Sequence, residues 1–265
     1  MKYNTLLIGG RGNIGAGLRT YLPNLNPGYQ FISIDLPGAA DKAIKSDTAT
    51  TFVDGNIIDQ PDILDEMLTD IDLVVYLARH GDLTTMNKMT DLVFEIVLSQ
   101  KNPPMIIGSS SVHAVDGAYH FFRKGVYGLI AERRFDDIKV WPDRLSASMP
   151  ACPINPYGEE KAYVEQWVER AAVKGCGAVA MRWGGVNARN TPLLEEVGYF
   201  SVWCHQEDAA RCVHAAYQAH LNRSLPDHGA HYFVISNNTY NIFDIETPRR
   251  EIGYEPQYNA ENYVD

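Results

Sequence analysis

Tyr157 and Lys161 have the residue types and the spacing of a proton-transfer pair. On a helix, residues four apart lie on one face, so the phenol and the ammonium would point the same way. A nearby ammonium favours the phenolate, and we expect Lys161 to lower the Tyr157 pKa from about 10 toward the range of a general base. Because an ordinary amphipathic helix can show the same spacing, the position of the pair in the chain has to decide.

Three serines, Ser109 to Ser111, end the strand predicted over residues 104–110. The Tyr157 pair opens the helix predicted over residues 156–174, which is the next regular helix of the pattern. A serine hydroxyl at the strand end could hold a reacting oxygen in line with the phenol. The combination predicts removal of a proton from a substrate hydroxyl, with Ser111, Tyr157 and Lys161 as the catalytic residues.

Glycines recur at Gly9, Gly12 and Gly15, between a predicted strand (5–9) and a predicted helix (12–22). They allow a tight turn and let backbone N–H groups, including those of Asn13 and Ile14, approach a pyrophosphate at the helix N-terminus. The alternative is a glycine turn that only packs the helix on the strand.

Asp35 ends the second predicted strand (31–36), 20 residues after Gly15. A carboxylate there would accept hydrogen bonds from the ribose hydroxyls of adenosine and repel a 2′-phosphate, which favours NAD over NADP. Arg11 argues the other way, since an arginine in the loop could reach that phosphate.

Strand-like and helix-like runs alternate along the first two thirds of the chain. Further strands are predicted over 51–56, 73–78 and 178–183, and further helices over 61–68 and 92–99. This alternation predicts an α/β fold, a Rossmann-type doubly wound parallel sheet with a small C-terminal substrate lobe. We expect a single domain over 1–265, with a cofactor-binding core over 1–183, an inserted excursion over 118–156 and the lobe over 184–265.

Composition narrows the class of protein. Of the 265 residues, 45% are hydrophobic and 21% are charged, as in ordinary globular proteins, and the net charge of −10 argues against a nucleic-acid partner. Four scattered cysteines indicate reduced thiols. No apolar run is long enough for a membrane span, and the chain begins directly with a predicted strand, so we expect a cytoplasmic protein. We expect no metal, because the segment from His205 through Asp208 to His214 reads as a capped helix start, with Asp208 satisfying free N–H groups.

Together these residues resemble the extended short-chain dehydrogenase/reductase family, also called the NAD-dependent epimerase/dehydratase family, over essentially the whole chain. The resemblance implies NAD as the cofactor and a homodimer formed through helices near 87–100 and 157–174. It also implies cofactor contacts at positions that the local spacing does not reveal: Asn56 and Ile57 at the adenine, and Leu77, Ala78 and Arg79 after the fourth strand.

Within that family the chain looks similar to the uronate dehydrogenases and to archaeal NAD-dependent glucose-6-phosphate dehydrogenases. The likeness lies in residues 110–115 and in residues 201–203 leading to Asp208. It implies that Ser111 is the catalytic serine and His113 a substrate contact. The chain departs at Val112, where the subgroup usually has Asn. It also lacks the expected carboxylate-binding Arg in the loop after the sixth strand, where Arg189 comes a few residues early.

The excursion makes the segment between Ser111 and Tyr157 45 residues long and carries several arginines. Guanidinium groups suit carboxylate or phosphate, so we expect Arg133 and Arg134 to bind an anionic or polar end of the substrate. Solvated or salt-bridged side chains are the alternative, in which case a uronate would depend on Arg189 or Arg79.

The sequence thus favours an enzyme that oxidises a hydroxyl, most simply the anomeric one, of a hexose, uronic acid or sugar phosphate. A nucleotide-sugar epimerase or dehydratase that retains NAD is the second interpretation. A non-catalytic dinucleotide sensor is the third, and the retained Tyr157 and Lys161 argue against it. Arg182 and Trp183 end the sixth predicted strand, either packing there or lying beside the nicotinamide.

Overall fold

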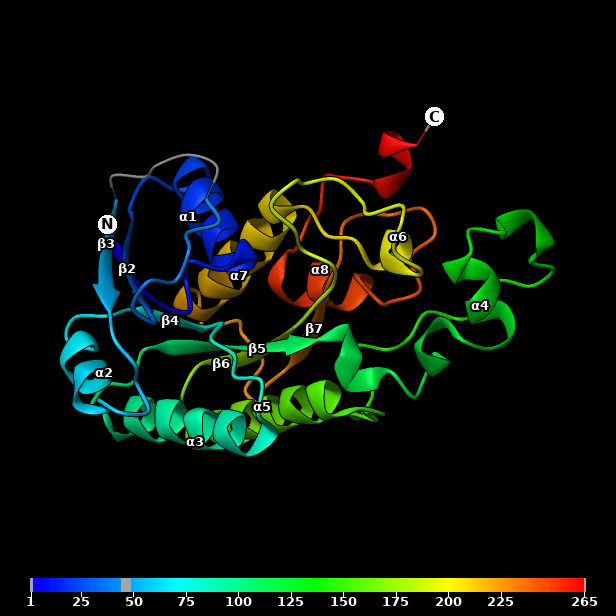
Figure 1. Cartoon of the computed structure of the whole chain (residues 1–265). Coiled ribbons are helices and arrows are strands. Elements are labelled where there is room, and N and C mark those ends of the chain that lie inside the picture. Colours follow the sequence, from blue (N-terminus) through cyan, green and yellow to red (C-terminus); the bar gives the residue numbers. More distant parts are fainter. Residues whose placement is uncertain (1, 44–48, 265) are drawn as a thin grey trace.

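The computed structural model describes residues 2–43 and 49–264. Its centre is a sheet of seven parallel strands in the order β3-β2-β1-β4-β5-β6-β7 (Figure 1). The strands are β1 (Tyr3–Ile8), β2 (Tyr29–Asp35), β3 (Thr50–Asp54), β4 (Leu73–Tyr76), β5 (Met105–Ser111), β6 (Ala178–Trp183) and β7 (His231–Val234). The predicted Rossmann-type parallel fold is confirmed.

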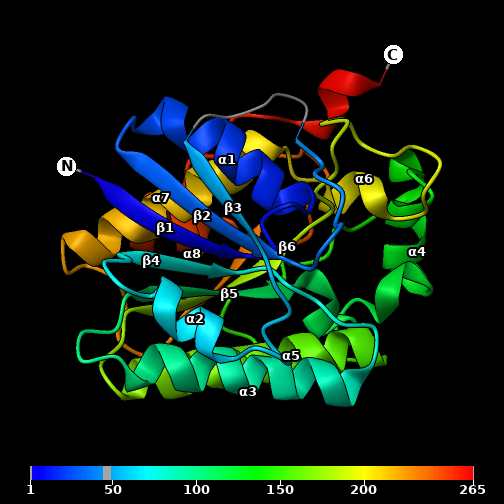
Figure 2. The same cartoon turned by 60° about the vertical axis from the view of Figure 1, so that its left-hand side comes forward.

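Helices cover both faces of the sheet, which explains why β4, β5 and β6 are buried along their whole length. α1 (Asn13–Leu25) and α7 (Gln206–Leu221) pack together on one face, joined there by α8 (Glu246–Ile252). α2 (Asp62–Met67), α3 (Leu83–Ser99) and α5 (Pro156–Val173) cover the other face, where α3 and α5 run side by side (Figure 2). Alternate residues of each strand therefore enter two separate apolar cores.

The structure extends the prediction in two places, at helix α3 and in the C-terminal segment 184–265. α3 contains the predicted helical residues 92–99 and begins earlier, at Leu83, because the Asp82 side chain caps it by accepting a hydrogen bond from the Thr85 N–H at 2.8 Å. The segment 184–265 supplies α7 and β7, which extend the central layers, as well as the short α6 (Tyr199–Val202).

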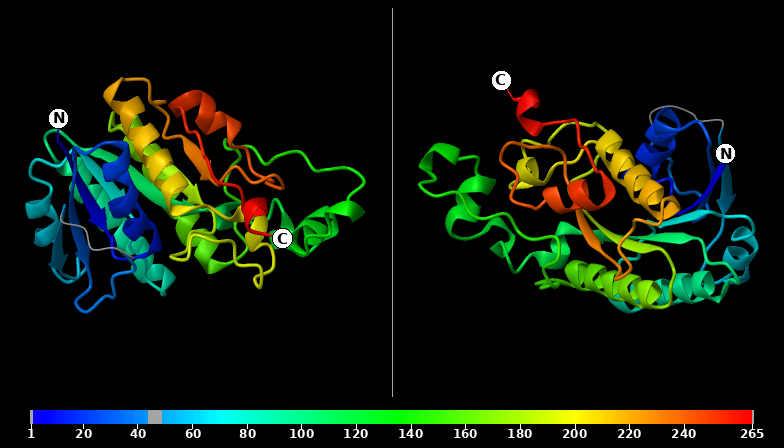
Figure 3. Two further views of the ribbon diagram at one scale, coloured as in Figure 1. Left: turned by 90° about the horizontal axis from the view of Figure 1, so that it is seen from above. Right: turned by 180° about the vertical axis from the view of Figure 1, so that it is seen from behind.

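The excursion over 118–156 leaves the sheet and projects beyond it (Figures 1 and 3). It contains α4 (Gly125–Ala131) and short 3-10 turns at His120–Phe122 and Phe135–Asp137. Its apolar side packs on residues after β7, and a backbone hydrogen bond joins Leu145 to Ile242. His120, Phe121 and Phe122 all have positive φ (49°, 45° and 58°), a left-handed conformation that side chains disfavour.

A buried ion pair ties the end of the excursion to the sheet. Arg182 on β6 is fully buried, and its Nε donates to Glu165 Oε1 at 2.7 Å. The same guanidinium donates to the carbonyls of Ala147 and Met149 at 3.2 and 2.9 Å. Arg182 therefore has a structural role, and Glu165 is the anion that makes its burial possible.

Replacement of Arg182 by Met should destabilise the fold by about 3–5 kcal/mol, because it strands the Glu165 carboxylate in the core. Urea unfolding followed by circular dichroism would measure the loss. The double variant Arg182→Met/Glu165→Met should recover much of the stability, since both charges are then gone. Arg134→Met, which removes an exposed ion pair with Asp137, is the control and should leave the unfolding midpoint unchanged. Equal midpoints for Arg182→Met and wild type would contradict the assignment.

Candidate active site

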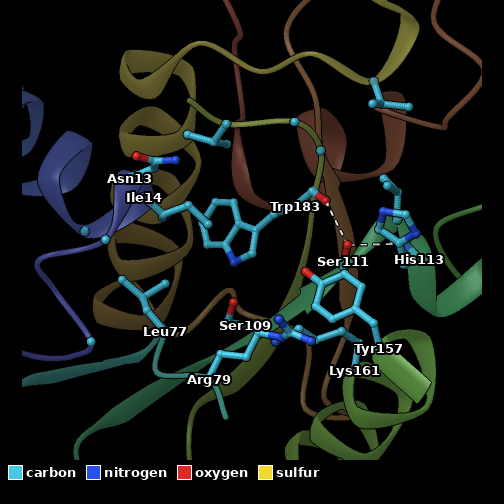
Figure 4. Close-up of a pocket in the computed structure, with 18 of the residues that line it drawn as sticks. Asn13, Ile14, Leu77, Arg79, Ser109, Ser111, His113, Tyr157, Lys161 and Trp183 are labelled. Atoms are coloured by element: carbon cyan, nitrogen blue, oxygen red, sulfur yellow. Dashed lines mark hydrogen bonds between the residues drawn. The ribbon is translucent and has the colours of Figure 1, made fainter. Parts of the chain in front are cut away.

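A cavity of about 410 Å³ opens at the carboxyl ends of the strands (Figure 4). The loop after β1, the ends of β4, β5 and β6, and the start of α5 all reach it. Its lining includes Gly9, Gly12, Asn13, Ile14, Gly15, Leu77, Arg79, Ser109, Ser111, His113, Tyr157, Lys161 and Trp183. The structure thus brings together most of the residues singled out in the sequence.

A second cavity of about 520 Å³ adjoins the first, and Gly9, Gly12, Leu77 and Arg79 line both. Asp35, Asn56, Ile57 and Ala78 line the second cavity alone. The two cavities form one elongated groove across the point between β1 and β4 where the strand order reverses, which is where doubly wound sheets bind dinucleotides.

The glycine loop fits a pyrophosphate. Gly9 has a φ of +90°, and a Cβ there would lie 2.6 Å from the backbone nitrogen of Ala78, so only glycine fits. A Cβ on Gly15 would collide with the backbone of Gly10. Gly12 begins α1 with no side chain capping it, which leaves the first N–H groups of a 13-residue helix for a phosphate.

Asp35 is held in place at the adenosine end. Its carboxylate accepts hydrogen bonds from the Arg11 backbone N–H at 3.1 Å and from Ser33 Oγ at 2.8 Å. The Arg11 guanidinium points elsewhere: it pairs with Asp54 at 2.7 Å and lies over the Phe52 ring. A 2′-phosphate would therefore meet two carboxylates and an arginine that is already neutralised.

Tyr157 lies in the first turn of α5. Asn155 caps this helix by accepting the Gly158 N–H at 2.9 Å, and Pro156 fits the first turn because its missing N–H needs no partner. The Ser111 hydroxyl, at the end of β5, accepts the His113 N–H at 3.3 Å and donates to the Trp183 carbonyl at 3.5 Å, and it lines the same cavity as Tyr157. Lys161 is 3% exposed, with its Nζ 5.4 Å from the centre of the Tyr157 ring.

The expected lowering of the Tyr157 pKa is wrong in sign. Burial raises the pKa of this phenol and outweighs the lowering effects of the Ser111 hydrogen bond and of the Arg79 charge. Burial also lowers the pKa of Lys161, because a buried ammonium is poorly solvated. The sequence analysis considered the charge of the lysine and left out the desolvation that both groups share.

A buried carboxylate that the sequence analysis missed lies beside the lysine. Glu160 is 2% exposed, and its Oε1 accepts the Arg79 Nε at 2.8 Å and the Lys161 Nζ at 3.3 Å. A glutamate next to the lysine was visible in the sequence, but its burial was not.

A second buried carboxylate orients His113. Asp116 is completely buried and accepts hydrogen bonds from His113 Nδ1 at 3.0 Å, Asn155 Nδ2 at 2.8 Å and the Tyr119 hydroxyl at 2.6 Å. Because a carboxylate only accepts, neutral His113 carries its proton on Nδ1, which leaves Nε2 as an acceptor. The imidazole ring packs edge-on against Tyr157, with 5.1 Å between the ring centres.

Other predicted substrate residues lie outside the main cavity. Arg134 is exposed and pairs with Asp137 and Glu132, and Arg189 is exposed and pairs with Glu195. Arg133 lines a separate hollow beside Phe200. Substrate contact by these arginines stays a prediction without support from their positions. The main cavity is lined instead by Glu196 and Tyr199, which the sequence analysis did not name, and by Val202 from the stretch 201–203.

The prediction that Asp208 caps a helix is wrong. His205 caps α7, with Nδ1 accepting the Glu207 N–H at 3.0 Å. The buried Asp208 carboxylate accepts the N–H groups of Gln257 and Tyr258 and the Ser236 hydroxyl, so it anchors the C-terminal segment. Burial raises the pKa of Asp208 to about 6. Within residues 2–43 and 49–264 no cluster of His, Cys, Asp and Glu side chains could hold a metal ion, and no helix is long and apolar enough to cross a membrane.

Comparison with known proteins identifies the family of the chain. Residues 5–190 match the model of the NAD-dependent epimerase/dehydratase family, so the chain belongs to that family, whose cofactor is NAD. No curated protein matches by sequence.

Solved structures share the fold. A mutated uronate dehydrogenase is similar over 99% of this chain and 84% of its own, with 16% identity and a TM-score of 0.70. A dTDP-glucose 4,6-dehydratase from Streptomyces venezuelae matches over 98% and 94%, with 15% identity and a TM-score of 0.65. A UDP-glucose 4-epimerase from Brucella ovis matches over 98% of both chains, with 15% identity and a TM-score of 0.64.

Asp35→Ala should weaken binding of NAD and narrow its preference over NADP, since the variant loses a charge-assisted hydrogen bond to the ribose and the repulsion of a 2′-phosphate. Isothermal titration of both dinucleotides would measure the two affinities. Asp227→Ala, which removes an exposed carboxylate outside both cavities, is the control and should leave both affinities unchanged. Wild-type protein that binds NADP more tightly than NAD would contradict this assignment and make Arg11 the deciding residue.

Proposed function

We propose that this member of the NAD-dependent epimerase/dehydratase family is a dehydrogenase that oxidises a hydroxyl of a sugar or sugar derivative. The observation that carries the proposal is the meeting of Ser111, Tyr157 and Lys161 at the inner end of a groove that fits a dinucleotide. The end of β5 and the first turns of α5 position these groups, as a proton-transfer site requires.

The residues suggest a division of labour. Bound in the groove, NAD would supply the hydride acceptor. The Ser111 hydroxyl holds the reacting oxygen near the phenol, and the Tyr157 phenolate takes the hydroxyl proton as the carbon loses its hydride. Lys161, held by Glu160, supplies positive charge beside the ring and favours the phenolate. The glycine loop would hold the pyrophosphate of the cofactor, and Asp35 would bind its adenosine ribose.

The substrate side of the cavity favours a polyhydroxylated ligand. His113 Nε2 makes no hydrogen bond to another described residue, so it can accept a hydrogen bond from a substrate hydroxyl. Glu196 and Tyr199 add further polar groups to the lining of the cavity. A hexose, a uronic acid or a sugar phosphate suits such a lining, and the anomeric hydroxyl is the simplest position for oxidation because it yields a lactone.

The competing function is an epimerase or dehydratase, in which the same residues act and the hydride returns to the sugar. A screen of aldoses, hexuronates and hexose phosphates with NAD separates the two. A dehydrogenase accumulates NADH in proportion to substrate consumed. Conversion of a nucleotide sugar without net NADH would replace the proposal by the epimerase or dehydratase function.

Tyr157→Phe should lower turnover by about 10²- to 10⁴-fold, because it removes the acid–base group while the ring still packs. NAD affinity, measured by titration calorimetry, should stay near the wild-type value. A variant that keeps more than about a tenth of the wild-type rate would show that another group takes the proton.

His113→Ala should raise KM for the substrate by about threefold to tenfold, since it removes one hydrogen-bonding group from the cavity. Arg134→Ala is the matched control from the excursion and should leave KM unchanged. The opposite pattern, with KM sensitive to Arg134 and insensitive to His113, would restore the excursion arginines as substrate ligands.

The assembly and the location are also part of the proposal. The outer faces of α3 and α5, which lie side by side, are a suitable surface for a homodimer. A molar mass of 29.6 kDa by light scattering, the mass of a single chain, would reject the dimer. The four cysteines are free thiols, which favours the reducing cytoplasm.

A further inference from the structure

Arg79 and Glu160 form an ion pair directly against the catalytic tyrosine. The Arg79 guanidinium carbon lies 4.5 Å from the centre of the Tyr157 ring, closer than the 5.4 Å of the Lys161 ammonium. Figure 4 shows Arg79 extending from the end of β4 toward Tyr157 and Lys161. Two cations therefore face one phenol, and the nearer one is not the lysine.

The pair has unequal exposure, which gives each partner a different role. Glu160 is 2% exposed, whereas the Arg79 side chain is 49% exposed. A buried carboxylate is costly unless it is paired, and Glu160 Oε1 accepts from both Arg79 and Lys161. The Glu160 carboxylate thus holds two cations: Lys161 from the same helix and Arg79 from the segment after β4.

We propose that Glu160 and Arg79 are positioning residues for Tyr157: Glu160 holds the guanidinium against the ring, and Arg79 stabilises the phenolate as a second cation. The importance of Glu160 and Arg79 for catalysis rests on the proposed function, but their effect on the ionisation of Tyr157 does not. The part of the Arg79 side chain that Glu160 and Tyr157 leave exposed lines the groove where the two cavities meet.

The charges around the phenol set the expected signs. The interaction with Ser111 from β5 lowers the Tyr157 pKa, and the Arg79 charge lowers it further. Glu160 on the same helix and Asp116 after β5 raise it. Lys161 and His113 complete the groups that face the ring. Removal of the Arg79 charge should therefore raise the Tyr157 pKa. The rise should be larger in protein with Glu160 than in the Glu160→Gln variant, because only Glu160 holds the guanidinium against the ring.

The test is a double-mutant cycle read by NMR on protein labelled with ¹³C at the tyrosine ζ carbon, without substrate or cofactor. Tyr157→Phe identifies the Tyr157 signal by its loss, and a pH titration follows its ionisation. Arg79→Gln should raise the pKa, and the rise should shrink when Glu160 is already Gln. Arg79→Lys should retain part of the lowering, and Arg134→Gln is the control that should leave the signal unmoved.

Two results would overturn the proposal. One is a Tyr157 titration that is the same in Arg79→Gln and wild type. The other is an equal rise in both Glu160 backgrounds, which would mean that Glu160 does not hold Arg79. If the Glu160 variant fails to fold, Arg79→Gln and Arg79→Lys still decide whether the cation acts on the phenol. Because the measurement needs no turnover, a failed sugar screen would reject the proposed function and leave this result standing.

Discussion

The parallel sheet imposes the constraint on which the site depends. Parallel strands place all their carboxyl ends at one edge, and the order reverses between β1 and β4, so the loops that follow these two strands diverge. The resulting crevice separates the glycine loop from Arg79, and the same edge carries Ser111 at the end of β5. Residues far apart in sequence thereby line one groove without any long loop to bring them there.

Burial then sets the chemistry at the inner end of that groove. Tyr157 and Lys161 both lose hydration, which opposes ionisation of each. With neutral neighbours alone, burial would leave the Tyr157 pKa high and the Lys161 pKa low. Glu160 stabilises the ammonium, while Ser111 and Arg79 favour the phenolate, so these neighbours oppose part of the effect of burial, which still dominates both pKa shifts. Tyr157 and Lys161 therefore ionise as members of this cluster and not as an isolated pair.

The sequence predicted what depends on local spacing. The glycines, Asp35, and the serine–tyrosine–lysine set could be assigned because each belongs to a short motif with a fixed place in a βαβ pattern. Arg79 and Glu160 are 81 positions apart, so no local pattern could pair them. The burial that reverses the Tyr157 pKa shift is equally a tertiary property. The positions of the excursion arginines are tertiary properties for a related reason: composition shows that guanidinium groups are present but not that Arg134 faces solvent beside Asp137.

Asp116 shows how an insertion can be attached without disturbing the catalytic helix. Its carboxylate accepts from Tyr119, near the start of the excursion, and from Asn155, near its end. Asn155 also caps α5, whose first turn presents Tyr157, and His113 completes the set from the turn after β5. Both ends of the excursion are therefore fixed to the same buried anion that orients a substrate-side imidazole. The mutual geometry of the phenol, the imidazole and the helix start is therefore fixed by contacts at the two ends of the excursion, and the residues between these ends make no contribution to it through Asp116.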